Sequence, residues 1–322
     1  MYSFVFMLKT YSQDQDYVSR LVETYCKYNK DNIRLFIVAP QEDMALFKEK
    51  YASIEHIEVL SENNLDVEYA HESINGMKAG YINQEIVKLA FWELGLCKNY
   101  LCLDSEAYFI RDFYLDDFMY DEEIPYTALI EDNDLKTNPN YYHCYWKERE
   151  KKIQIIQDEM EYHPKHLLTC HGFQIFNANV LKRLKTDYMS LNNLSYLDLI
   201  MLSPYEFSWY NIWLQKSQVM PIHMCEPFFK TYHMAYQQFG DVMSNVDETE
   251  LSRGYVGVVI NSNYTKRKII KVNDIAKLHY RIVNNKMLNE IRQIVNISYK
   301  KEFRRRVVST LYSMVTRKNS KY

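Results

Sequence analysis

Two carboxylates follow an apolar, strand-like run in the segment NYLCLDSEAYFIRDF, residues 99–113. The run stops at Asp104, and Glu106 comes two residues later, before the chain becomes apolar again. On an extended backbone, side chains at positions i and i+2 face the same way. Divalent cations such as Mg²⁺ and Mn²⁺ prefer oxygen ligands. The spacing therefore predicts a metal site, and the alternative is a turn with solvated acids.

The elements that lead to these acids alternate between strand and helix. The expected strands are 2–10, 33–40 and 56–62, and the expected helices are 14–29, 41–52 and 80–96. This alternation predicts a mostly parallel central sheet flanked by helices. The acids then lie at the carboxyl end of the fourth strand, which is where ligands bind in open α/β sheets.

The composition indicates a folded chain with reduced thiols. Of its 322 residues 47% are hydrophobic, which is enough for a substantial core. Six cysteines occur without a CxxC pair, and neither a signal-peptide pattern nor a run of 18 apolar residues is present. These features predict a cytoplasmic protein.

Charge is distributed unevenly along the chain. The formal net charge is −3, yet residues 251–322 contain 17 Lys/Arg against 3 Asp/Glu. Residues 1–250 therefore contain the remaining 22 Lys/Arg and 39 Asp/Glu. Within the basic part, residues 299–318 place a basic cluster ahead of apolar positions on one helix face. Such a helix can lie on an anionic membrane, and the alternative is packing against its own domain or a dimer partner. Nucleic acid is not expected, because no recognition motif accompanies the charge.

Four segments, in this order, resemble GT-A-type nucleotide-sugar glycosyltransferases. VFMLKTYSQD resembles their first strand and nucleotide-facing loop, and GYINQEIVKLAF followed by NYLCLDSEAYFIRDF resembles their helix–strand–DxD order. HGFQIFNANVLKRL resembles the acceptor-side strand, and SPYEFSWYNIWL resembles the segment where many bacterial members place an acid. The resemblance covers about residues 1–240 and implies a GT-A-like, Rossmann-like catalytic domain at 1–250 and a basic, mainly helical region at 251–322.

The resemblance implies a metal-dependent transfer of a sugar from a nucleotide-sugar donor to a glycan or lipid-linked acceptor, as in the synthesis of bacterial surface polysaccharides. Asp104 and Glu106 would hold Mn²⁺ or Mg²⁺, and the metal would stabilise the departing nucleoside diphosphate. His233 is the preferred third ligand and His223 its alternative. Where the family usually has a second Asp this chain has Glu106, which leaves direct or water-mediated binding open.

Further residues are expected around the donor. Thr10 and Tyr11 close the first strand and are candidates for contacts with the base and ribose. Gln84 and Lys88 lie one turn apart on the helix before the acids, where relatives use polar or basic residues to hold the nucleotide. Lys230 is a candidate for contact with a diphosphate oxygen. Each also has an ordinary explanation, as part of a helix N-cap region, an amphipathic helix face or a solvated lysine.

An inverting transfer needs a base for the acceptor hydroxyl. Glu206 is the first candidate, because its aromatic neighbours would raise its pKa and stack on a sugar face. Asp198 is the second candidate. A retaining enzyme needs no such base, and the sequence leaves the stereochemistry open.

Two other functions stay open. A nucleotidyltransferase shares the fold class and the metal chemistry, but usually shows a Gly-rich signature that is absent here. A non-catalytic scaffold would dock other glycan enzymes on the inner face of the cytoplasmic membrane through the basic region.

The stretch HPKHLLTCH, 163–171, also offers ligands for zinc, although its spacing matches no familiar structural pattern.

Overall fold

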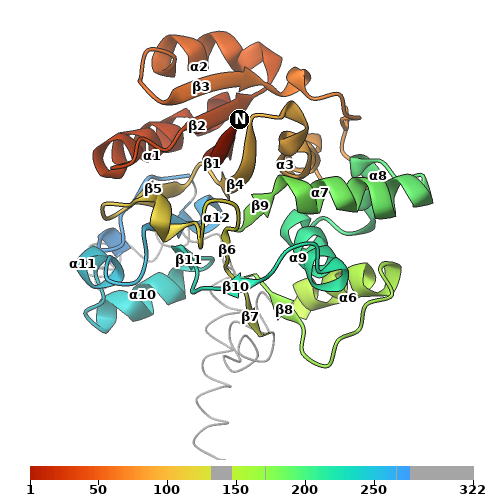
Figure 1. Ribbon diagram of the computed structural model, residues 1–322. Helices are drawn as coiled ribbons and strands as arrows, with labels where there is room; N and C mark the ends of the chain where they lie inside the picture. The colour runs from red at the N-terminus through yellow and green to blue at the C-terminus, as the bar shows by residue number, and fades with distance from the viewer. Residues whose placement is uncertain (132–146, 171, 266, 276–322) are drawn as a thin grey trace, which may run out of the picture. The chain divides into compact units, whose positions relative to one another are not determined.

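The computed structural model describes residues 1–131, 147–170, 172–265 and 267–275 (Figure 1). These residues form two compact units. The first comprises Met1–Lys230 with Tyr255–Gly257, and the second comprises Thr231–Gly254 and the chain from Val258 onward. The predicted basic helix at 299–318 lies outside the described residues. The functional division at residue 250 stays a prediction.

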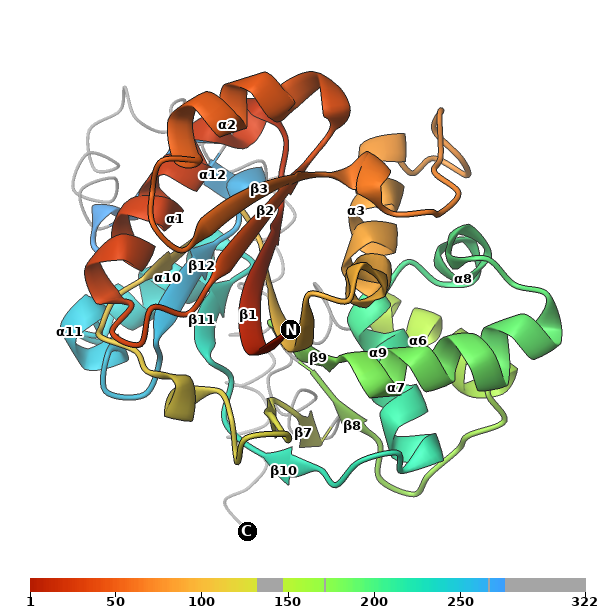
Figure 2. The ribbon, with the colours of Figure 1, turned by 45° about the horizontal axis from the view of Figure 1, so that its top comes forward.

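A five-stranded sheet forms the centre of the first unit, in the order β3-β2-β1-β4-β9 (Figure 2). The strands are β1 (Tyr2–Lys9), β2 (Leu35–Ala39), β3 (Ile57–Ser61), β4 (Cys97–Leu103) and β9 (Ile175–Asn177). The first four are parallel, and β9 is antiparallel to β4. The predicted mostly parallel sheet, flanked by helices, is therefore confirmed.

Helices cover both faces of this sheet, which explains why its strands are almost continuously apolar. The first three are α1 (Gln15–Tyr28), α2 (Met44–Tyr51) and α3 (Ala79–Ala90). On one face, the Phe6 ring of β1 meets the Tyr25 ring of α1 with 6.2 Å between centroids. On the other, Met7 shares a core cluster with Ile82 and Ile86 of α3. The sheet is therefore sealed from both sides, and its polar chemistry is confined to the strand ends.

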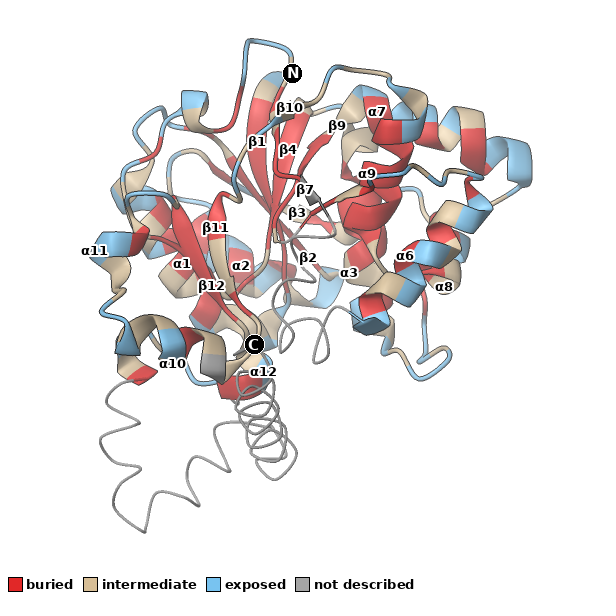
Figure 3. Ribbon diagram, turned by 90° about the horizontal axis from the view of Figure 1, so that it is seen from below, coloured by how far each residue is buried: buried red, intermediate tan, exposed pale blue. Residues whose placement is uncertain are grey.

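A helical part of the first unit begins before β9 in the sequence and continues after it. It contains α6 (Lys147–Glu159), α7 (Ala178–Leu184), α8 (Tyr196–Leu202) and α9 (Glu206–Ser217). Helix α9 is buried along most of its length (Figure 3). Gln215 of α9 exchanges hydrogen bonds of 3.0 and 2.9 Å with the backbone of Leu168 in β8 (Leu168–Thr169). The chain before β9 therefore runs alongside α9.

The remaining elements are short. They are β5 (Ala107–Phe109), β6 (Tyr126–Thr127), β7 (Ile130–Glu131), β10 (His223–Met224), β11 (Phe229–Tyr232), β12 (Gly257–Ile260), α10 (Ala235–Met243), α11 (Glu248–Leu251) and α12 (Ser262–Thr265). No helix in the described part of the chain has the length and apolarity needed to cross a membrane.

Candidate active site

The acids at 104–106 lie in a tight turn that connects β4 to β5. The Ala107 amide donates to the Asp104 carbonyl at 3.0 Å and closes the turn. The buried Ser105 hydroxyl lies 3.0 Å from the hydroxyl of Thr10, the residue that follows β1. The acids therefore follow the fourth strand, as predicted, but the alternation of side chains on an extended strand does not apply to them. The hydrogen bond between hydroxyls joins the carboxyl ends of β1 and β4.

Arg20 of α1 fixes the same turn from the other side. Its guanidinium donates to the Glu106 carbonyl at 2.7 Å. It also stacks over the Tyr108 ring, 4.3 Å from the ring centroid. The backbone that carries both acids is thus held between α1 and the end of β1.

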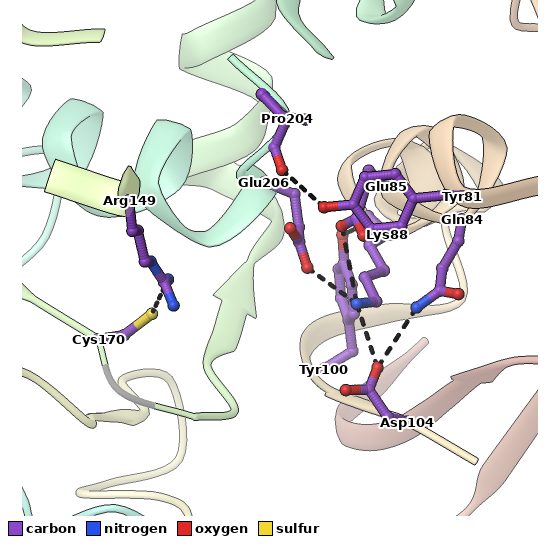
Figure 4. Close-up of polar contacts among 10 residues, drawn as sticks. All are labelled: Tyr81, Gln84, Glu85, Lys88, Tyr100, Asp104, Arg149, Cys170, Pro204 and Glu206. Carbon is purple, nitrogen blue, oxygen red and sulfur yellow. Dashed lines mark hydrogen bonds and ion pairs between the residues drawn. The ribbon is translucent and has the colours of Figure 1, made fainter. Parts of the chain in front are cut away.

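The Asp104 side chain points toward α3 and is partly exposed to solvent (Figure 4). Its Oδ1 lies 3.2 Å from Lys88 Nζ and 3.4 Å from Gln84 Nε2, while its side chain is 32% exposed. The helix positions these two side chains together because they are one turn apart. The structure therefore brings Gln84, Lys88 and Asp104 together, and their role in donor binding stays a prediction.

Lys88 is the centre of a buried charge cluster. Its side chain is 3% exposed, and Nζ lies 2.8 Å from Glu206 Oε1 and 3.7 Å from Glu85 Oε2. Burial lowers the pKa of Lys88, but the three neighbouring carboxyl groups raise it well above its usual value. Lys88 is therefore a permanent cation at the base of the candidate site.

The two buried carboxyl groups beside Lys88 differ in their protonation. Burial raises the pKa of Glu85, the neighbouring Glu206 raises it further, and the pKa ends well above the usual value. Burial also acts to raise the pKa of Glu206, but Lys88 and a hydrogen bond with Glu85 outweigh it, and this pKa is lowered. Glu85 therefore holds its proton to a higher pH than Glu206 does.

The expectation that aromatic neighbours raise the pKa of Glu206 is thus wrong. The Phe207 ring, whose centroid lies 5.1 Å from Lys88 Nζ, packs against the ammonium that stabilises this carboxylate. A buried carboxylate with a lowered pKa is a weak base. Its geometry fits a counter-ion for Lys88, and its role as acceptor base stays a prediction.

Glu85 is the site residue that the sequence pattern did not single out. It lies three residues before Lys88, so both side chains share one helix face. The available signal was a pair of opposite charges on the apolar side of a predicted amphipathic helix. Such a pair is not expected on a buried face unless each charge has a partner.

Two other predicted residues lie in helix-terminus positions. Asp198 accepts hydrogen bonds from the backbone and hydroxyl of Ser195, at 2.8 and 2.7 Å, in a capping box at the start of α8. This exposed carboxylate thereby has a structural role. Tyr11 is half-exposed and precedes the short helix at Ser12–Asp14, whereas Thr10 is buried at the strand end.

The predicted third metal ligand and the diphosphate lysine lie near the boundary of the two units. Lys230, in β11, is the last residue of the first long segment of unit 1, and His233 belongs to unit 2. Their roles stay predictions. His223 stacks against Tyr120 instead, with 3.5 Å between ring centroids.

No zinc site is evident at the histidine-rich stretch. Throughout the described ranges, no three His, Cys, Asp or Glu side chains form a group that could hold a metal. His163 pairs with Asp158 at 3.6 Å, and the buried Cys170 thiol lies 3.8 Å from the Arg149 guanidinium. His171, the last histidine of the stretch, lies outside the described residues.

Comparisons with known proteins place the chain in a family. No curated protein matches it. Among solved structures, the apo form of mouse xyloside xylosyltransferase 1 is similar with a TM-score of 0.44 and 11% identity, over 81% of this chain and 98% of that one. A family model described as a family of unknown function, DUF6492, matches residues 3–248, which is more than half of the chain. The chain therefore belongs to the DUF6492 family.

Proposed function

We propose that the protein is a glycosyltransferase that takes its sugar from a nucleotide-sugar donor. One observation carries the proposal: the turn with Asp104 and Glu106 is joined to the end of β1 and is faced by the buried cation Lys88. The carboxyl ends of parallel strands are the usual ligand site of an α/β sheet. Acids and a fixed cation at that place suit a diphosphate shared with a divalent metal.

The residues at the turn fit Mg²⁺ or Mn²⁺. Asp104 and Glu106 are half-buried oxygen donors at one short turn. Mg²⁺ usually takes one or two carboxylates and completes its shell with water and substrate phosphates. A set of two protein carboxylates agrees with this pattern, and His233 is proposed as a third ligand from its sequence position alone. When bound, the cation would offset the charge of the diphosphate leaving group.

Neighbouring residues would orient the acids and support the leaving group. Lys88 holds Asp104 by its Oδ1 and places a positive charge where negative charge develops on the diphosphate. Glu206 keeps Lys88 in position and charged. Thr10 holds Ser105, and with Tyr11 it would face the nucleoside. Lys230 is proposed as a further contact for the diphosphate.

The acceptor proposed is a glycan or a lipid-linked glycan of a surface polysaccharide. Its support is the basic, amphipathic pattern of residues 299–318, which suits an anionic membrane surface. For an inverting transfer, Glu206 and, second, Asp198 are proposed as the acceptor base from their sequence positions alone.

Calorimetric titration tests the proposal directly. Wild-type protein is expected to bind UDP or GDP only with Mn²⁺ present, and Asp104→Asn is expected to lose this binding by about tenfold or more, because one metal ligand is removed. Asp116→Asn is the matched control, since this exposed carboxylate lies outside the cluster.

Failure of every nucleoside diphosphate to bind, or equal binding by Asp104→Asn, would contradict the proposal. A donor-hydrolysis assay with a panel of nucleotide sugars then separates an enzyme from a scaffold, because a scaffold releases no sugar. Release of pyrophosphate from a nucleoside triphosphate and a sugar phosphate would indicate a nucleotidyltransferase instead.

A further inference from the structure

Several buried polar side chains in the first unit lack nitrogen or oxygen hydrogen-bond partners among the residues that the structure describes, and three of these are amide or hydroxyl side chains that are almost fully buried. These three are Gln174, Ser208 and Asn211, with exposed fractions of 0%, 3% and 1%. Both amide atoms of Gln174 and the Ser208 hydroxyl are unpartnered, and the Asn211 amide has only the Cys170 thiol, a weak hydrogen-bonding group, beside it. A buried polar group without a partner costs about 1–3 kcal/mol. A cluster of such groups is therefore expected only where it serves something other than stability.

Two of these side chains share one face of α9, since Ser208 and Asn211 are three residues apart. The chain before β9 runs along this helix in the opposite direction. At its start Leu168 is bonded to Gln215, and further on Cys170 is close enough to Asn211 for the amide to influence the pKa of the thiol, which burial raises.

Gln174 follows on this path, immediately before β9. Two residues later, the Phe176 ring lies 5.5 Å from the Phe207 ring and 4.6 Å from the Tyr210 ring. Gln174 is therefore opposite the same stretch of α9 that carries Ser208 and Asn211.

The cluster of Gln174, Ser208 and Asn211 adjoins the charged site. Gln174 immediately precedes β9, where Phe176 pairs with Tyr100 of β4. The Tyr100 hydroxyl in turn donates to the Lys88 carbonyl at 2.6 Å, so the face of the sheet that carries Tyr100 packs against α3. On α9, Ser208 is two residues beyond Glu206, the counter-ion of Lys88.

We propose that Gln174, Ser208 and Asn211 form the subsite that binds the hydroxyl groups of the transferred sugar; this inference rests on the proposed function. A carboxamide offers an N–H donor beside a carbonyl acceptor, which matches two adjacent hydroxyl groups of a sugar ring. All three side chains are neutral, and the nearby Lys88 is already balanced by carboxylates. The subsite therefore suits an uncharged, hydroxyl-rich ring rather than a phosphate or a carboxylate.

The test compares the affinity for a nucleoside diphosphate with that for its nucleotide sugar, by calorimetry with Mn²⁺. The variants Gln174→Met and Asn211→Leu replace each amide by an apolar side chain of similar volume. Each is expected to reduce the affinity gained from the sugar by about tenfold, because two hydrogen bonds are lost. The affinity for UDP alone is expected to stay within about twofold. Both variants are also expected to melt at or above the wild-type temperature, because a buried polar group without a nitrogen or oxygen partner is removed.

Gln215→Met is the matched control. Gln215 is a buried amide on the same helix, but its amide is bonded to the backbone of Leu168 and Asn211. This variant is expected to melt at a lower temperature and to keep the full gain in affinity from the sugar. Ser208→Ala, the mildest change, replaces either amide variant that fails to fold.

If both amide variants keep the full gain in affinity that the sugar gives, the proposed subsite is wrong, and the three side chains bind internal water instead. If wild-type protein binds no nucleotide at all, the proposed function fails separately. Saturation-transfer NMR with methyl glucoside, galactoside, mannoside and xyloside then tests the subsite alone. Transfer to ring protons that is lost in Gln174→Met supports the subsite, and no transfer in wild-type protein overturns it.

Discussion

Lys88 brings three carboxyl groups around one ammonium, and the balance of these charges governs the candidate site. Asp104, Glu206 and Glu85 all lie within 3.7 Å of its Nζ. Because the raised pKa of Glu85 lets this residue keep its proton, the cluster carries one negative charge less than its composition indicates. Glu206, whose pKa is lowered, keeps a negative charge beside Lys88, and Asp104 is the carboxylate that the proposal gives to a metal.

The proton on Glu85 makes stability depend on pH. The unfolded chain ionises Glu85 near its usual pKa of 4.5, whereas the folded chain retains the proton to a higher pH. Folding therefore takes up a proton above pH 4.5, and the free energy of unfolding falls as pH rises, by up to about 1.4 kcal/mol per pH unit, until folded Glu85 ionises.

Glu85→Gln is expected to remove this dependence. Urea unfolding from pH 5 to 9 should show the variant gaining stability relative to wild type as pH rises, because glutamine has no proton to release. The exposed Glu49→Gln on α2 is the control and should differ from wild type by a constant amount. A constant difference for Glu85→Gln as well would show that Glu85 is already ionised in the folded protein.

At the level of elements, the apolar runs and their alternation were enough to predict β1 to β4, the helices between them and the position of the acids. Local pattern is sufficient there because β1, β2 and β4 are buried on both faces and β3 alternates between buried and exposed side chains. The pattern could not reveal that Glu206 lies against Lys88, because the two are 118 residues apart and meet only through the packing of α9. The unpartnered state of Gln174 likewise depends on which groups surround it in space.

Strand β12 begins at a close approach of three chain segments. A Cβ on Gly257 would lie 2.2 Å from Cε1 of the Phe229 ring and 2.6 Å from the Tyr108 carbonyl oxygen. The backbone of β5 on one side and an aromatic ring on the other leave no room for a methyl group.

Gly257→Ala is therefore expected to destabilise the protein by about 1–3 kcal/mol, as overpacking does. Thermal melting or urea unfolding measures the change. Gly80→Ala in α3 is the matched control, because a Cβ there meets nothing within 4 Å and alanine favours a helix. Equal stability of both variants would mean that the groups around Gly257 move aside for a methyl group at little cost in free energy.

Across the whole molecule, charge is divided between a strongly acidic first part and a basic last part of the chain. An acidic domain is repelled by anionic lipid, so residues 251–322 would have to supply the attraction. About 1 kcal/mol per Lys or Arg is available near such a surface.

Replacing Arg304, Arg305 and Arg306 together by Gln is expected to weaken binding to phosphatidylglycerol-containing vesicles about 100-fold, since three charges contribute about 3 kcal/mol. Co-sedimentation at low and high salt measures this. The same three positions changed to Lys keep the charge and should keep the binding. Equal binding by the Gln variant would remove the membrane from the proposal.

The sequence separation of 118 between Lys88 and Glu206 also sets the order in which they are synthesised. Ribosomes add about 5–20 residues per second, so Glu206 is made on the order of ten seconds after Lys88. Over that interval the nascent chain holds every strand from β1 to β4, but α3 lacks the helix that will enclose its ammonium. Until α9 is synthesised, Lys88 therefore has no Glu206 beside it as a counter-ion.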